Sequence, residues 1–85
     1  MKANHKNIIR NLNIAKGQIE GIIKMIEDDR YCIDIYDQIN ATRAILNTTN
    51  NSILEAHIKH CVKNAIENGD DSKIDEVLKA INRSK

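Results

Sequence analysis

The segment RYCIDIYDQINATRAILNTTNNSILEAHIKHCVKNAIE, residues 30–67, decides the fold of this chain. It contains neither proline nor glycine, so nothing in it interrupts a helix. Apolar and small residues recur along it at alternating spacings of three and four, which is the period of one helical face. We therefore predict a single helix about 55 Å long, at a rise of about 1.5 Å per residue. The residues on this face are Cys32, Ile35, Ile39, Thr42, Leu46, Thr49, Ile53 and Ala56.

A second helix is expected upstream, over about residues 4–27, because the same spacing of apolar residues recurs there. Asp28 and Asp29 favour the start of a helix, both as caps and as negative charges at the positive end of the helix dipole. We therefore place the break before the long helix at these aspartates. The apolar series of the upstream helix is Ile8, Leu12, Ala15, Ile19, Ile22 and Ile26.

A short third helix is expected downstream, over about residues 73–82. Gly69 predicts the stop of the long helix, because glycine takes the left-handed conformation without steric cost. Four apolar residues at helical spacing follow it. The expected fold class is thus all-α, with three helices in one domain spanning residues 1–85. The four residues of the third series are Ile74, Val77, Leu78 and Ile81.

Size predicts self-association. A chain of 85 residues without Trp or Phe buries only about 60–65% of its unfolded surface, so its core is marginal. The long helix is too long for the two shorter helices to cover its whole apolar face. Part of that face must therefore pack against another subunit. We expect a homo-oligomer. No apolar run is long enough for a signal peptide or a membrane span, which predicts a cytoplasmic protein with no membrane partner.

Three side chains of the long helix predict a site for a soft metal ion. His57 and Cys61 are four residues apart, on one helix face and about 6 Å from each other. Cys32 comes 25 residues before His57, about 38 Å away on a continuous helix. If two copies of the helix pack antiparallel about a two-fold axis near Ile45, Cys32 of one copy falls beside His57 and Cys61 of the other. Two identical sites per dimer would follow.

The donor set favours Cu(I). Soft thiolates select this ion, and it accepts three ligands, whereas Zn(II) prefers four. His60 is the nearest candidate for a fourth ligand, but it is offset by about 100° from Cys61, and we expect it to be a surface histidine. Two cysteines in a reducing compartment are more often thiols than a disulfide, which leaves metal binding or redox chemistry.

These residues belong to a longer pattern. It comprises GQIEGI at residues 17–22, MIEDDRYCIDI at 25–35 with Gln38, Ile39, Ala41 and Arg43, and LEAHIKHCV at 54–62. Over about residues 8–66 the chain resembles the copper-sensing operon repressor (CsoR) family. The resemblance implies an antiparallel four-helix-bundle dimer core, usually a dimer of dimers. It further implies a repressor that binds operator DNA when metal-free and leaves it when Cu(I) binds to Cys32, His57 and Cys61.

Sister branches of that family differ at these positions. The nickel and cobalt branch has His in place of Cys61, the persulfide-sensing branch lacks the His found here at 57, and the formaldehyde branch lacks the second Cys. Each departure favours copper. The resemblance also implies that Tyr31 and Glu76 surround the ligating histidine, where a hydrogen bond fixes its tautomer and raises its basicity.

Positive charge is concentrated at the N-terminal end. Residues 1–26 contain five basic residues and only one acidic residue, Glu20. The five basic residues fall within about 120° on a helical wheel. This predicts either a face that tracks phosphates or the solvated side of an amphipathic helix. The resemblance favours DNA contacts from the first helix and the middle of the second. The residues implied are Lys6, Arg10, Lys16 and Arg43, while Asn11, Asn13 and Thr48 stand where family members commonly have Arg or Lys.

Three functions therefore remain open. The first is a Cu(I)-responsive repressor. The second is a repressor of the same fold that senses persulfide or other reactive sulfur, with Cys32 and Cys61 of neighbouring subunits forming a disulfide or polysulfide bridge. The third is a helical copper-binding module without DNA binding. We do not expect an enzyme, because the only nucleophile and base candidates are the same Cys and His groups, and no glycine-rich phosphate loop occurs.

Overall fold

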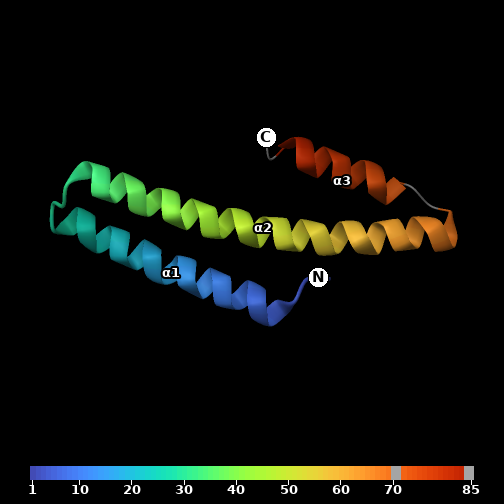
Figure 1. Cartoon of the computed structure of the whole chain (residues 1–85), viewed down its shortest axis with the longest axis horizontal. Helices are drawn as coiled ribbons and strands as arrows, with labels where there is room; N and C mark the ends of the chain where they lie inside the picture. The colour runs from blue at the N-terminus through green and yellow to red at the C-terminus, as the bar shows by residue number, and fades with distance from the viewer. Residues whose placement is uncertain (70–71, 84–85) are drawn as a thin grey trace. The chain divides into compact units, whose positions relative to one another are not determined.

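The fold consists of three α-helices in the part of the chain that the structure describes. The computed structural model describes residues 1–69 and 72–83, and no strand occurs among them. The helices are α1 (His5–Glu27), α2 (Cys32–Asn68) and α3 (Ser72–Arg83) (Figure 1). The all-α class and the three predicted helices are confirmed. Their ends agree to within about two residues, the usual uncertainty of a helix boundary.

The aspartates between α1 and α2 end one helix and do not start the next, which corrects the predicted role. Asp28 is the C-terminal cap of α1, and Asp29 takes a left-handed conformation with φ 54°. The backbone N–H of Arg30 donates to the Met25 carbonyl at 2.9 Å, and that of Asp29 donates to the Ile26 carbonyl at 3.1 Å. These two bonds close a Schellman motif, which satisfies carbonyls at the end of α1. Aspartate tolerates this conformation better than most residues.

The chain divides into two compact units. One contains Asn4–Asn51, and the other contains Ser52–Lys85 together with Met1–Ala3. The boundary falls inside α2, so this helix contributes to both units. That the whole chain acts as one domain stays a prediction.

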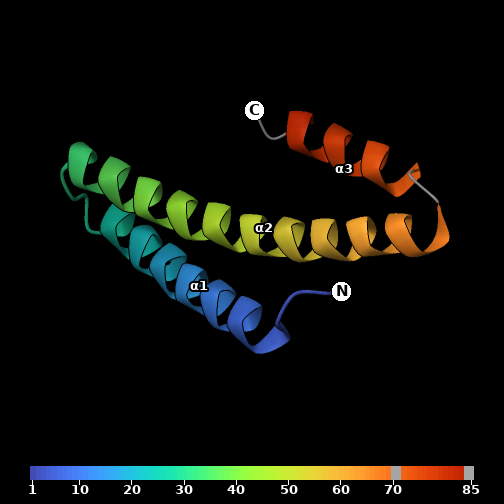
Figure 2. The same ribbon diagram turned by 45° about the vertical axis from the view of Figure 1, so that its right-hand side comes forward.

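The first unit is an antiparallel hairpin of α1 and the first part of α2 (Figures 1 and 2). Only every seventh residue of the predicted α1 series is buried, namely Ile8, Ala15 and Ile22. The alternate residues Leu12 and Ile19 are each 46% exposed. One neighbouring helix covers only one of the two heptad rows, so the second row remains available to another partner.

The second unit consists of the later part of α2 and α3. Its most buried side chains are Cys61 on α2 and Val77 on α3. α2 ends as predicted at Gly69, whose φ is 67° and whose N–H donates to the Ala65 carbonyl at 2.9 Å. Over residues 1–69 and 72–83, no helix combines the length and apolarity that crossing a membrane requires.

Candidate metal centre

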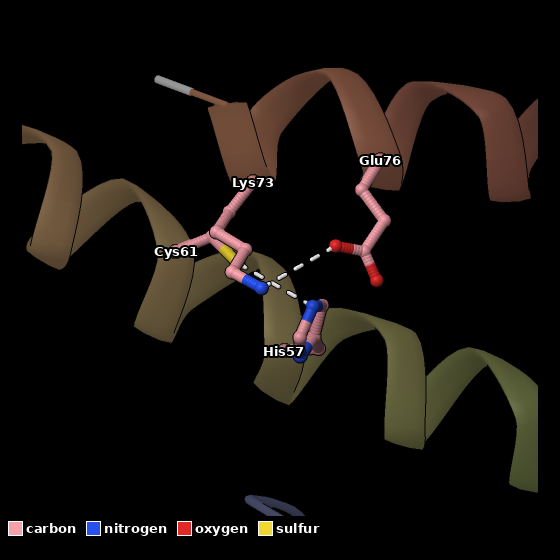
Figure 3. A network of polar contacts seen from close by, with 4 residues as sticks. All are labelled: His57, Cys61, Lys73 and Glu76. Carbon is pink, nitrogen blue, oxygen red and sulfur yellow. Dashed lines mark hydrogen bonds and ion pairs between the residues drawn. The ribbon is translucent and has the colours of Figure 1, made fainter. Parts of the chain in front are cut away.

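His57 and Cys61 lie together on the later part of α2, as their spacing predicts. The Nε2 atom of His57 is 3.4 Å from the Sγ atom of Cys61 (Figure 3). One helical turn separates the two residues, which places both side chains on the same face. Cys61 is only 3% exposed and His57 is half-buried. The structure thus joins a thiol and an imidazole in a shielded position.

This pair lines a cavity of about 380 Å³. His60 lines it too and is half-buried, so it is less exposed than a fully solvated surface histidine; that it stays outside the ligand set remains a prediction. The Nδ2 amide of Asn64, one turn further along α2, lies 3.1 Å from His60 Nε2. The cavity is lined by Met1, Lys2, Ile53, His57, His60, Cys61, Asn64 and Lys73.

Glu76 extends from α3 towards His57 and Cys61, but the residue with which it forms an ion pair is Lys73. Its carboxylate forms an ion pair of 3.7 Å with the ammonium of Lys73. Figure 3 shows the side chains of Lys73 and Glu76 extending from α3 towards the His57 and Cys61 side of α2. A hydrogen bond from Glu76 to His57 stays a prediction. Sequence reasoning missed Lys2 and Lys73, because no local motif connects either residue to residues 57–61.

Cys32 and Tyr31 belong to the other unit. Cys32 is the first residue of α2, and its thiol is free and exposed. Tyr31 precedes it and is 66% exposed. Among the described residues of one chain, no three His, Cys, Asp or Glu side chains form a group that could hold a metal ion. The structure therefore brings together two of the three predicted ligands, and leaves Cys32 accessible to another chain.

The predicted DNA-contacting residues all lie in the hairpin unit. Lys6 and Arg10 line a shallow hollow on α1 with Ile9, Asn13 and Ile14. Lys16 is exposed on the same helix. Arg43 is exposed on α2, where its Nη1 donates to the Asn40 side-chain oxygen at 3.4 Å.

The register of the hairpin places Lys16 and Arg43 near its middle, with Lys6 and Arg10 further from the turn. Thr42 of α2 is hydrogen-bonded to Gln18 of α1, so Arg43 lies about level with Lys16. Five acids occupy the other end, around the turn between the helices. The half of the hairpin away from the turn, residues 4–17 and 42–51, contains these four basic residues and no acid; we call it the basic end. Positive charge without nearby carboxylates favours contact with an anionic polymer. The five acids are Glu27, Asp28, Asp29, Asp34 and Asp37.

Comparison with known families completes this picture. A family model described as a metal-sensitive transcriptional repressor matches residues 4–83. The chain belongs to this family. The match includes the whole of α1, α2 and α3, so it covers the metal-centre candidates and the basic end of the hairpin together.

Relatives within this repressor family are similar over most of their length. The copper-sensing transcriptional repressor CsoR of Bacillus subtilis is 42% identical over 82 residues, covering 88% of this chain and 81% of the relative. The copper-sensing transcriptional repressor RicR of Mycobacterium tuberculosis is 39% identical over 80 residues, covering 91% and 83%. Among solved structures, the chain is similar to the crystal structure of the copper-sensing repressor CsoR with Cu(I) from Geobacillus thermodenitrificans. The two sequences are 40% identical, and the structures superpose with a TM-score of 0.84, covering 92% of this chain and 82% of that chain.

Proposed function

We propose that this family member is a Cu(I)-responsive transcriptional repressor, which binds operator DNA when metal-free and leaves it when copper binds. The observation that carries the proposal is the contact of 3.4 Å between His57 Nε2 and Cys61 Sγ. A thiolate and an imidazole are a donor pair that suits a soft monovalent ion. The copper-sensing names of the relatives from Bacillus subtilis and Mycobacterium tuberculosis support the same reading.

The distance between the two donors fits a shared ion. Metal bonds of about 2.3 Å to sulfur and about 2.0 Å to nitrogen separate the two donor atoms by about 3.5–4 Å at ordinary coordination angles. The observed contact is close to that range, so little rearrangement would be needed. Cys32 of a second copy is the third ligand we propose, because its thiol is exposed at the start of α2. Bound copper would supply a cross-link between subunits.

Assembly is supported by the apolar side chains that one chain leaves uncovered. Leu12 and Ile19 of α1 are each 46% exposed, and Ile39 and Leu46 of α2 are 44% and 40% exposed. Burying a large aliphatic side chain stabilises by about 1.5–3 kcal/mol, so two chains gain by joining these rows. The four-helix-bundle dimer, and a dimer of such dimers, are our proposal for the assembly. Sedimentation should show no folded species of 9.7 kDa.

DNA binding is proposed for the basic end of the hairpin, through Lys6, Arg10, Lys16 and Arg43. We place the protein in the cytoplasm, where operator DNA is accessible, and propose no enzymatic activity. Copper can release the operator only if it binds the DNA-free form more tightly than the DNA-bound form. Tyr31 and Glu76 are proposed to transmit that preference by orienting His57.

The test follows copper binding and DNA binding together. Cu(I) is titrated against a tight chelator while the mobility of DNA from the promoter of its own gene is measured. We expect one Cu(I) per chain and release of DNA over the same range. Tight copper binding without any DNA complex would contradict the repressor function and support a copper-binding module without DNA binding. A DNA complex that responds to persulfide and ignores copper would instead support a reactive-sulfur sensor.

A further inference from the structure

Two lysines line the same cavity as His57 and Cys61. They are Lys2 and Lys73, and no acidic residue is among the described residues that line it. Lys73 reaches this cavity from α3 (Figure 3). Both Lys73 and its partner Glu76 are largely exposed, with 62% and 65% of their side chains accessible. Such an exposed pair is weak, so Glu76 offsets only part of the Lys73 charge. The remaining positive charge can act on an ion bound in the cavity.

The charge of a dithiolate site depends on the ion it takes. Loading Cu(I) onto two thiols releases two protons to solvent and leaves a centre with one negative charge, since the imidazole stays neutral. Loading a divalent ion by the same exchange leaves a neutral centre. The difference of one charge holds whatever the protonation of the free thiols. A nearby cation therefore stabilises the Cu(I) centre relative to the divalent one.

The surrounding charges favour the monovalent case. Lys2 and Lys73 contribute positive charges to the lining of the cavity, and no described carboxylate lines it. With Cu(I) bound to two thiolates, the single negative charge of the centre would be stabilised by these lysines. A divalent centre would be neutral and would gain no such stabilisation next to Cys61, which is 3% exposed and therefore screened less than a surface group.

We infer that Lys73, together with Lys2, is a determinant of selectivity for a monovalent soft ion over divalent ions at this site. The inference rests on the proposed copper function and deepens it. Lys73 does not bind the metal. It acts through the electrostatic potential at the thiolates, and its contribution is to the ratio of two affinities, not to the presence of the site.

The experiment measures Cu(I) and Zn(II) dissociation constants of the full chain by chelator competition, at low and at high salt. In Lys73→Gln the Cu(I)/Zn(II) affinity ratio should fall about threefold to fivefold, and in the Lys2→Gln, Lys73→Gln double variant about tenfold. Lys73→Arg keeps the charge and should keep the ratio. Lys79→Gln is the matched control, because Lys79 is exposed on the same helix and does not line the cavity.

The salt dependence of the Cu(I)/Zn(II) affinity ratio is a second measurement. A purely structural role of Lys73 would not make the effect of Lys73→Gln depend on salt. Raising the salt concentration from 0.1 to 1 M shortens the Debye length from about 10 to about 3 Å, so the difference between wild type and Lys73→Gln should shrink. An unchanged ratio in Lys73→Gln, or an equal fall in Lys79→Gln, overturns the inference. Failure of the wild type to bind Cu(I) at all would overturn the proposed function instead.

Discussion

The side-chain hydroxyl of Thr42 on α2 donates a hydrogen bond of 2.7 Å to the side-chain oxygen of Gln18 on α1. Thr42 is 6% exposed, so this bond lies inside the seam of the hairpin. The same hydroxyl is 3.2 Å from the Gln38 carbonyl one turn earlier on α2. A polar contact at a position that a heptad pattern assigns to the core restricts how far the two helices can slide past each other.

Thr42→Val should destabilise the protein, because it leaves the Gln18 oxygen without its hydrogen-bond donor. Valine has nearly the same shape as threonine, so packing should change little. We expect a loss of about 1–2 kcal/mol in the free energy of unfolding. Urea unfolding at a fixed protein concentration measures it. Combining Thr42→Val with Gln18→Leu should recover much of the loss. Thr48→Val is the control, since Thr48 is exposed on the same helix, and an equal loss there would refute the role of the hydrogen bond.

Arg10→Gln combined with Lys16→Gln should weaken operator binding and reduce its salt dependence. Each lost phosphate contact lowers the slope of log affinity against log salt by about 0.9. Fluorescence anisotropy of labelled operator DNA at several salt concentrations gives both quantities. Lys24→Gln is the matched control, because Lys24 is paired with Asp28 at 3.7 Å near the acidic turn. If the double variant binds as the wild type does, the basic end is only a solvated surface.

Cys32→Ala and Cys61→Ala homodimers should each fail to bind Cu(I) tightly, if the site is shared between subunits. A mixed dimer of the two variants should recover one complete site. One of its interfaces joins an intact Cys32 to an intact His57 and Cys61, while the other interface loses both cysteines. Chelator competition on the reconstituted mixture counts the sites. A site contained within one chain would show no recovery on mixing.

His57→Ala should separate copper capture from operator release. Two thiolates can still hold Cu(I), because two-coordinate binding suits this soft ion. The imidazole link towards Tyr31 and Glu76 is then missing, so the variant should bind copper and remain on DNA. Parallel copper and operator titrations measure the two events. A variant that releases DNA as the wild type does would make His57 a bystander and favour the reactive-sulfur sensor.

The sequence by itself determined the helices and the local part of the site. Apolar spacing of three and four, the absence of proline and the glycine at position 69 are local properties, and each acts within one or two helical turns. The same reasoning predicted that His57 and Cys61 share a face, because their spacing fixes their relative position on α2.

Only the tertiary structure decided the contacts between helices. It showed that Asp29 closes α1 in a left-handed conformation, that His60 lines the cavity, and that Lys73 from α3 lies at the same cavity and pairs with Glu76. It also showed that Ile8 is 5% exposed while Leu12, four residues later in the same series, is 46% exposed. A pattern of spacing reports which residues share a face, but the helix that packs against that face determines which of them are buried. That choice depends on residues distant in sequence, and no local period encodes it.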